Sequence, residues 1–306
     1  MSQPTSELAI SVADLTKDYD GLRAVDSANF KVPLGTICGF VGPNGSGKTT
    51  TIRMLLGLIE PNAGRGEILG EPIGHPERYL ARVGAMIEGP AFYPALSGEE
   101  NLRVLATLGG CDQSRVRELL ALVGLEDRGG SKYKTYSLGM KQRLGIAAAL
   151  LPDPKLLILD EPTNGLDPAG IQEIRDLLTD LSKKGVTVFV SSHLLSEIEM
   201  ISDYLVILRR GKVIFFGRTE DLLLQSRATI TAIPQNPEDM AKLHSLVESA
   251  GHQARIDSKE LHIQANPEWG SELNKLAFEN GIVLREITPV RATLEETFFE
   301  LTEGTR

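Results

Sequence analysis

The sequence predicts an α/β fold, in which helices pack on a mostly parallel sheet, followed by a small α+β domain. Three observations support this prediction. Strand and helix patterns alternate along residues 155–217, which is the order of a parallel sheet. The stretch "TICGFVG" (residues 36–42) is apolar enough for a strand buried on both faces, as parallel sheets require. After residue 217 the order becomes strand, helix, strand, strand, helix, strand, which is typical of a split β-α-β sandwich.

The N-terminal part begins with short strands. Apolar alternation bounded by turn residues predicts them at "LAISVADL", "SANFKV" and "TICGFVG" (residues 8–15, 27–32 and 36–42). Helical spacing follows in "KTTTIRMLLGLI" (48–59), and the turn-rich "EPNAGRG" (60–66) predicts a break. Two helical stretches, "GEENLRVLATLG" and "QSRVRELLALVG", then predict a helical sub-region between residues 98 and 124.

The remaining elements of this domain follow in a regular order. Expected in turn are a helix at 136–151, a strand at 155–161, a helix at 169–185, a strand at 186–193, a helix at 195–203 and a hairpin at 204–217. The domain is expected to span residues 8–218.

A second domain is expected at residues 227–306. Its predicted elements are a strand at 228–233, a helix at 237–251, a hairpin at 254–265, a helix at 268–281 and a strand at 283–289. A final amphipathic helix is expected at 293–302, with its stripe of Leu294, Phe298 and Leu301 packed in a core or against another subunit.

Composition limits the classes of function. The formal net charge is −9, and residues 219–306 carry 15 acidic against 8 basic side chains, so nucleic acid and anionic lipid are not expected as main partners. The longest run without polar residues is 144–151, whereas a membrane-spanning helix needs about 20 residues. No secretory signal is visible, and two cysteines, Cys38 and Cys111, are too few for a disulfide framework. We expect a cytoplasmic protein, with Cys38 buried.

The stretch "GPNGSGKT" (residues 42–49) fits the phosphate-loop pattern G-x-x-x-x-G-K-[ST]. It lies between a buried strand and a helix, where backbone N–H groups form a nest for phosphates and the helix N-terminus adds partial positive charge. Lys48 is expected to reach the outer phosphates, and the Thr49 hydroxyl to ligate Mg²⁺. The residues predicted to bind the nucleotide here are Gly42, Pro43, Asn44, Gly45, Ser46, Gly47, Lys48, Thr49 and Thr50.

Two carboxylates follow the apolar strand "LLIL". Asp160 ends this strand, so its carboxylate is held rigidly toward the metal. Glu161 comes next and is expected to orient and deprotonate a water that attacks the γ-phosphate. By itself an acidic pair at a strand end is more often a solvated pair; the phosphate loop is what favours catalysis.

With these residues the chain resembles the ABC ATPases, the motor subunits of ABC transporters. "YSLGM" (136–140) is similar to their signature L-S-G-G-Q, with Leu138 and Met140 departing from the common form. "NGLD" (164–167) resembles the D-loop. His193 in "VSSH" resembles the switch histidine that contacts the γ-phosphate, and Tyr19 the aromatic platform for adenine, with Val25 below it. Six motifs stand in family order between residues 8 and 217.

The resemblance implies a P-loop NTPase of ABC type, a mixed sheet with helices and a helical sub-region, that uses ATP and Mg²⁺. No residue near the phosphate loop obviously covers the γ-phosphate from outside. In the family, the signature of a second subunit does so, which implies a head-to-tail dimer of two copies. Ser137, Gly139 and Asp167 would then contact the nucleotide in trans. Glu88 stands where the family usually has Gln, and a carboxylate there can reach Mg²⁺ or the attacking water.

The family also implies a membrane permease on a separate chain, with this subunit on the inner face of the membrane. The text "GPAFYPALSGEENL", the signature and the appended domain resemble the antibiotic and lantibiotic-peptide resistance exporters. An ABC importer ATPase is the alternative, although importers usually append strand-rich barrels. A soluble ABC ATPase acting on ribosomes or DNA fits less well, because such proteins carry two ATPase halves or a long coiled coil. The transported substrate cannot be read from this chain.

Overall fold

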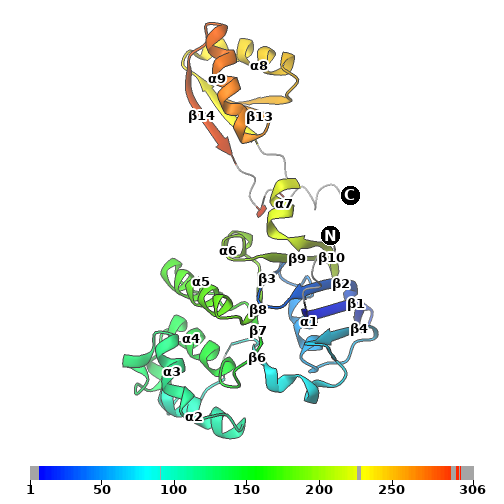
Figure 1. Ribbon diagram of the computed structural model, residues 1–306, viewed down its shortest axis with the longest axis vertical. Helices are drawn as coiled ribbons and strands as arrows, with labels where there is room; N and C mark the ends of the chain where they lie inside the picture. Colours follow the sequence, from blue (N-terminus) through cyan, green and yellow to red (C-terminus); the bar gives the residue numbers. More distant parts are fainter. Residues whose placement is uncertain (1–6, 90, 226–228, 291–293, 296, 298–306) are drawn as a thin grey trace. The chain divides into compact units, whose positions relative to one another are not determined.

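The computed structural model describes residues 7–89, 91–225, 229–290, 294, 295 and 297. These residues belong to two compact units, the first ending at Thr219 and the second beginning at Glu220 (Figure 1). In the described part of the chain, no helix is long and apolar enough to cross a membrane.

The centre of the first unit is a six-stranded sheet with the order β10-β9-β3-β8-β7-β6. All neighbours pair in parallel except the hairpin β9–β10. The strands are β3 (Ile37–Val41), β6 (Val83–Met86), β7 (Leu156–Asp160), β8 (Thr187–Ser192), β9 (Tyr204–Arg209) and β10 (Lys212–Arg218). Every residue of β3, β7 and β8 is buried, and for β3 this burial was predicted from its apolar sequence. Cys38 is fully buried in β3, and this burial raises the pKa of its thiol.

A second, antiparallel sheet has the order β2-β1-β4-β5. Its strands are β1 (Leu8–Tyr19), β2 (Leu22–Pro33), β4 (Ala63–Ile68) and β5 (Glu71–Pro72). Helix α1 (Lys48–Leu55) lies between this sheet and the six-stranded sheet (Figure 1). The shared core includes a cluster of three aromatic rings, in which Phe30 lies 5.8 Å from Phe40 and 6.0 Å from Phe189, centroid to centroid.

The other helices cover the remaining faces. Helices α5 (Pro168–Lys183) and α6 (Leu195–Glu199) pack on the opposite face of the central sheet from α1 (Figure 1). The predicted helical sub-region is present as α2 (Gly98–Leu108), α3 (Arg115–Leu122) and α4 (Leu138–Ala149), which contact one another. Helix α2 begins at a capping box, because Ser97 and Glu100 each accept a backbone N–H of the other.

The expected break at residues 60–66 is wrong in its second half. Strand β4 begins at Ala63 and pairs with β1. Its sequence hides this, because in "AGRGEI" only Gly66 and Ile68 are buried. Gly64 marks the close approach of the two strands: a Cβ there would lie 2.2 Å from the carbonyl oxygen of Asp14. Strand β6 was also not predicted, and the helices expected at 48–59 and 195–203 end at Leu55 and Glu199.

The boundary between the two units falls at the start of α7 (Thr219–Gln225), and the elements after α7 have the predicted split β-α-β order. The antiparallel sheet of the second unit runs β12-β13-β11-β14, with two helices on one face. The elements are β11 (Thr229–Pro234), α8 (Met240–Ser249), β12 (Ala254–Asp257), β13 (Glu260–Gln264), α9 (Gly270–Glu279) and β14 (Leu284–Val290). The helix predicted at 293–302, with Phe298 and Leu301, falls largely outside the described residues, within which Leu294 is buried.

Candidate nucleotide site

The phosphate loop connects β3 to α1, and its backbone leaves room only for glycine at two positions. A Cβ on Gly42 would lie 2.2 Å from the carbonyl oxygen of Leu208. Gly47 has φ 107°, and a Cβ there would lie 2.4 Å from the carbonyl oxygen of Ala24. Pro43, Asn44 and Gly45 form the exposed tip of the loop.

The first turn of α1 presents groups that suit a phosphate. Its N-cap is Gly47, no side chain caps its first N–H groups, and the turn itself contains no acidic residue. Ser46 Oγ is buried without a hydrogen-bond partner within the described residues. Thr49 and Thr50 stand half-buried in this turn. Free N–H groups and an unpaired buried hydroxyl at a helix N-terminus fit an anion such as a phosphate chain.

Lys48 is held inside the loop rather than extended into water. Its side chain is 6% exposed, and Nζ donates a hydrogen bond of 2.6 Å to the carbonyl oxygen of Gly42. Nζ also lies 3.2 Å from Glu161 Oε1. The structure therefore brings the loop lysine and the predicted base together as an ion pair, within reach of the N-terminus of α1.

Asp160 and Thr49 meet at the carboxyl ends of the central strands. Thr49 Oγ1 donates a hydrogen bond of 2.7 Å to Asp160 Oδ2, and Ser191 Oγ donates one of 2.5 Å to Oδ1. A hydroxyl and a carboxylate are oxygen ligands that suit Mg²⁺, which usually keeps waters and binds substrate phosphates for its other positions. The described residues contain no cluster of three or more His, Cys, Asp or Glu fit to hold a metal.

Glu161 also contacts the predicted switch histidine. Its Oε2 lies 2.7 Å from His193 Nδ1 and accepts a hydrogen bond of 3.3 Å from the His193 backbone N–H. The backbone of Glu161 has φ 50°, an unusual value for a residue with a side chain, and its N–H donates to Ser191 Oγ at 2.9 Å. Lys48 in α1 and His193, which follows β8, thus converge on the Glu161 carboxylate.

Glu88 follows β6 at the rim of the same region. Its carboxylate pairs with Arg53 in the last turn of α1, and its side chain is 62% exposed. With Asp160 and Glu161 it lines a hollow of about 530 Å³, whose other walls include Leu138 and Lys141 at the start of α4. In this structure the Glu88 carboxylate is therefore directed to a cation on α1 and not to Thr49 or Asp160.

The two residues expected at the adenine base differ in exposure. Tyr19 ends β1 with 42% of its surface exposed, and Lys17 Nζ lies 5.2 Å from its ring centroid. Val25 in β2 is fully buried and packs beneath Gly47, with Cγ2 3.4 Å from the position of a Cβ there. Tyr19 can offer a face to a base, while Val25 supports the loop from below.

The residues expected to act in trans stand at two helix N-termini. Ser137 caps α4, accepting a hydrogen bond of 3.2 Å from the Met140 N–H, and Asp167 caps α5, accepting one of 3.0 Å from the Gly170 N–H. Gly139 lies in the first turn of α4. Among the residues that the structure describes, no hydrogen bond or ion pair joins these three to the phosphate loop.

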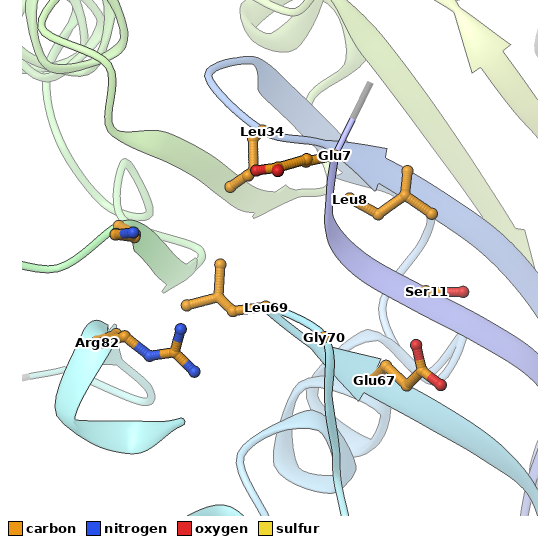
Figure 2. A pocket seen from close by; sticks show the side chains of 9 residues that line it. Glu7, Leu8, Ser11, Leu34, Glu67, Leu69, Gly70 and Arg82 are labelled. Atoms are coloured by element: carbon orange, nitrogen blue, oxygen red, sulfur yellow. The ribbon is translucent and has the colours of Figure 1, made fainter. Parts of the chain in front are cut away.

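A second hollow lies away from this chemistry. It has a volume of about 430 Å³, and Figure 2 shows its lining, with Arg82 and Leu69 among the labelled side chains. Arg82 and Lys155 precede β6 and β7, so the hollow lies at the amino ends of these strands. The nucleotide residues lie at the carboxyl ends, where ligands of open α/β sheets bind.

Sequence reasoning missed four residues of the site. Ser191 bonds both Asp160 and the Glu161 backbone, Arg53 pairs with Glu88, and Thr163 bonds Glu197. The doubled serine in "VSSH" was the only available signal for Ser191; the other two contacts join segments 34 or more residues apart.

Comparisons with known proteins agree with this geometry. A family profile described as ABC transporter matches residues 25–164. The bacitracin transport ATP-binding protein BcrA of Bacillus licheniformis is 42% identical over 96% of this chain and 97% of its own length. The lantibiotic transport ATP-binding protein SrtF of Streptococcus pyogenes is 41% identical over 67% of this chain and 89% of its own.

A solved structure described as the ATP-binding subunit of an ABC transporter superimposes with a TM-score of 0.64 at 34% identity, covering 71% of this chain and 92% of its own. The resemblance found in the motifs thus extends to the fold. The similarity to BcrA covers nearly the whole chain. The chain belongs to the ABC transporter ATP-binding family, whose members are ATPases.

Proposed function

We propose that this chain is the ATP-hydrolysing motor of an exporter of antibiotics or peptides. The observation that carries the proposal is the contact of Glu161 with both Lys48 and His193, beside the Thr49–Asp160 pair. A base held by a histidine next to a phosphate loop is the arrangement that ATP hydrolysis needs. The names of the relatives BcrA and SrtF, for bacitracin and lantibiotic transport, support the cargo class.

The residues divide the work as follows. The N–H groups of the phosphate loop and Lys48 hold the phosphates, and Thr49 and Asp160 hold Mg²⁺. Mg²⁺ neutralises the charge that develops on the phosphates. When the nucleotide binds, Lys48 leaves Glu161 and pairs with the phosphates. The Glu161 carboxylate is then free to accept a proton from the attacking water. His193 keeps that carboxylate in place, and Tyr19 stacks on the adenine base.

A second copy of the chain completes each site. The N-terminus of α4, with Ser137 and Gly139, supplies N–H groups and partial positive charge suited to the γ-phosphate. Ser137 Oγ and Asp167 Oδ1 each cap their own helix, so both helix starts are preformed before two copies meet. The dimer is head-to-tail, with two shared ATP sites.

The transport partner is a permease on a separate chain, and this subunit binds it on the inner face of the membrane. The appended second unit, an antiparallel sheet with two helices on one face, favours an exporter over an importer, whose appended domains are usually strand-rich barrels.

Resistance of cells tests the function directly. A sensitive strain is given this chain with its membrane subunit, and the inhibitory concentrations of bacitracin and of a lantibiotic are measured. We expect a rise of at least several-fold for one of them, and no rise with Glu161→Gln. Equal sensitivity of all strains to both, while the purified chain hydrolyses ATP, would overturn the cargo class and leave the ATPase assignment intact.

A further inference from the structure

We propose that Thr163 and Glu197 are positioning residues, which hold the catalytic Glu161 and His193 in register through a buried hydrogen bond. The proposal rests on the roles given above to Glu161 and His193. It adds a buried link between the two segments that carry them, residues 160–167 and 191–199, which Ser191 also joins through its bonds to Asp160 and Glu161.

The contact itself is direct and shielded from water. Thr163 Oγ1 donates a hydrogen bond of 2.7 Å to Glu197 Oε2, and each residue is only 9% exposed. A carboxylate removed from water needs a donor, because an unpaired one is strongly unfavourable. Glu197 is therefore fixed on Thr163 by its own desolvation.

Thr163 and Glu197 lie close in the sequence to the two catalytic residues that they are proposed to position. Thr163 comes two residues after Glu161, and Glu197 four residues after His193. The catalytic contact, Glu161 Oε2 to His193 Nδ1, also measures 2.7 Å. These two contacts thus join the same two segments, the outer contact buried and the inner one facing the nucleotide site. Displacement of either segment would break both.

The local structure of these segments makes such a link necessary. Helix α6 has only five residues, and its N-cap, Leu194, provides no side-chain hydrogen bond. Residues 161–167 form no regular helix or strand before α5 begins. Glu161 is in addition held at φ 50°. Strained and short segments keep their geometry only when surrounding contacts fix them.

A purely structural role predicts a different result from a positioning role. Loss of the link should let Glu161 and His193 separate by a fraction of an ångström, and a misplacement of 1 Å can cost about 100-fold in rate. Among the residues that the structure describes, the phosphate loop makes no hydrogen bond or ion pair with Thr163 or Glu197, so nucleotide affinity should be retained. The signature of positioning is therefore a fall in kcat at unchanged ATP affinity.

The experiment measures kcat, ATP affinity and thermal midpoint for the full chain and its variants. We expect Thr163→Val and Glu197→Ala each to lower kcat about 10-fold or more, with the double variant no slower than the slower single one. Thr163→Ser and Glu197→Gln, which keep a hydroxyl donor and an oxygen acceptor, should stay within about threefold of wild type.

Thr179→Val is the matched control, because it also removes a threonine hydroxyl, one that bonds the Arg175 carbonyl oxygen on α5. It should leave kcat unchanged. Wild-type kcat in Thr163→Val, additive losses in the double variant, or a loss in Glu197→Gln as large as in Glu197→Ala would each overturn the proposal. Glu161→Gln is assayed alongside: if it too hydrolyses ATP normally, the proposed catalytic site fails, whereas its inactivity beside an active Thr163→Val rejects only the link.

Discussion

At the scale of single residues, Glu161 contacts several of the other residues of the nucleotide site. Its carboxylate contacts Lys48 and His193, and its backbone N–H bonds Ser191. Lys48 comes from α1, whereas Ser191 lies in β8 and His193 follows that strand. A change at one of these side chains should alter one function and leave the others measurable.

Replacing the base separates chemistry from binding. Glu161→Gln keeps the size of the side chain and can still accept hydrogen bonds, but it cannot take a proton from water. We expect ATP affinity to be retained and kcat to fall by about 10²–10⁴-fold. Single-turnover hydrolysis and nucleotide titration check this, and an unchanged rate would place the base elsewhere.

Lys48→Ala should have the opposite signature. The ammonium is nearly buried, and among the described residues the contacts of the loop include no other cationic side chain. Removal of a charge-assisted contact should therefore weaken ATP binding itself, by tenfold or more for a loss of about 1.5–3 kcal/mol. Normal affinity by calorimetry in this variant would contradict the phosphate-loop assignment.

Changes at Glu88 and at Arg53 should shift the Mg²⁺ requirement in opposite directions. We propose that Glu88 leaves Arg53 to contribute charge near Mg²⁺ when ATP is bound. Glu88→Gln should then raise the Mg²⁺ concentration for half-maximal hydrolysis, while Arg53→Ala, which frees the carboxylate, should lower it. ATP affinity in saturating Mg²⁺ should not change. Magnesium titrations that superimpose on wild type for both variants would remove Glu88 from the metal site.

At the scale of elements, the start of α4 interlocks with the segment between β7 and α5. Leu138, which departs from the family's common form, places Cδ2 3.0 Å from the position of a Cβ on Gly165, and Leu166 Cδ2 lies 3.8 Å from that of Gly139. Each leucine packs over the glycine of the other segment. The departure at Leu138 is thereby accommodated by Gly165, which has φ 77°.

Gly165→Ala should therefore destabilise the domain. A Cβ meets both an unfavourable backbone conformation and the side chain of Leu138, and strain of this kind costs about 1–3 kcal/mol. Gly74→Ala is the control, since a Cβ there meets nothing within 4 Å and its φ is not positive. Urea unfolding measures the difference, and equal midpoints for the two variants would show that the segments are not tightly packed.

The elements also show what the sequence can predict. Strands β3, β7 and β8 were found because each contains a run of buried apolar residues, which stands out in the sequence. Strand β4 was missed because most of its side chains face water and two of its residues are glycine. Its position depends on pairing with β1, a contact that leaves no periodic pattern in its own residues.

The same division applies within the site. The phosphate loop and the pair Asp160–Glu161 follow from local sequence, because their chemistry depends on neighbours in the chain. The bond between Thr163 and Glu197 and the pair of Arg53 with Glu88 depend on how distant segments pack. No spacing rule contains that information, so only the structure could place them.

At the scale of the whole molecule, each unit has its own apolar core. The core of the second unit is formed by its sheet and by α8 and α9. The first unit holds every residue assigned to the nucleotide site. Thr219 belongs to the first unit through its N–H bond to the Asp203 carbonyl oxygen.

A chain that ends at residue 225 should therefore fold and bind ATP with wild-type affinity. It keeps the Thr219 contact and α7, whose Leu222 is buried. We expect its dimerisation or its regulation to change, which light scattering and ATPase assays would detect. An unfolded truncated chain would show that the two cores depend on each other and that the proposed boundary is wrong.

Two copies of this chain are proposed to close on shared ATP, and the mass of an ATP-bound variant that cannot hydrolyse ATP tests this. Glu161→Gln is mixed with Mg²⁺ and either ATP or ADP, and its mass is measured by sedimentation. We expect a dimer with ATP and a monomer with ADP. We also expect a monomer with ATP when Ser137→Arg is added, because the arginine blocks the N-terminus of α4. A monomer under every condition, with ATP bound, would contradict the proposed ATP-bound dimer.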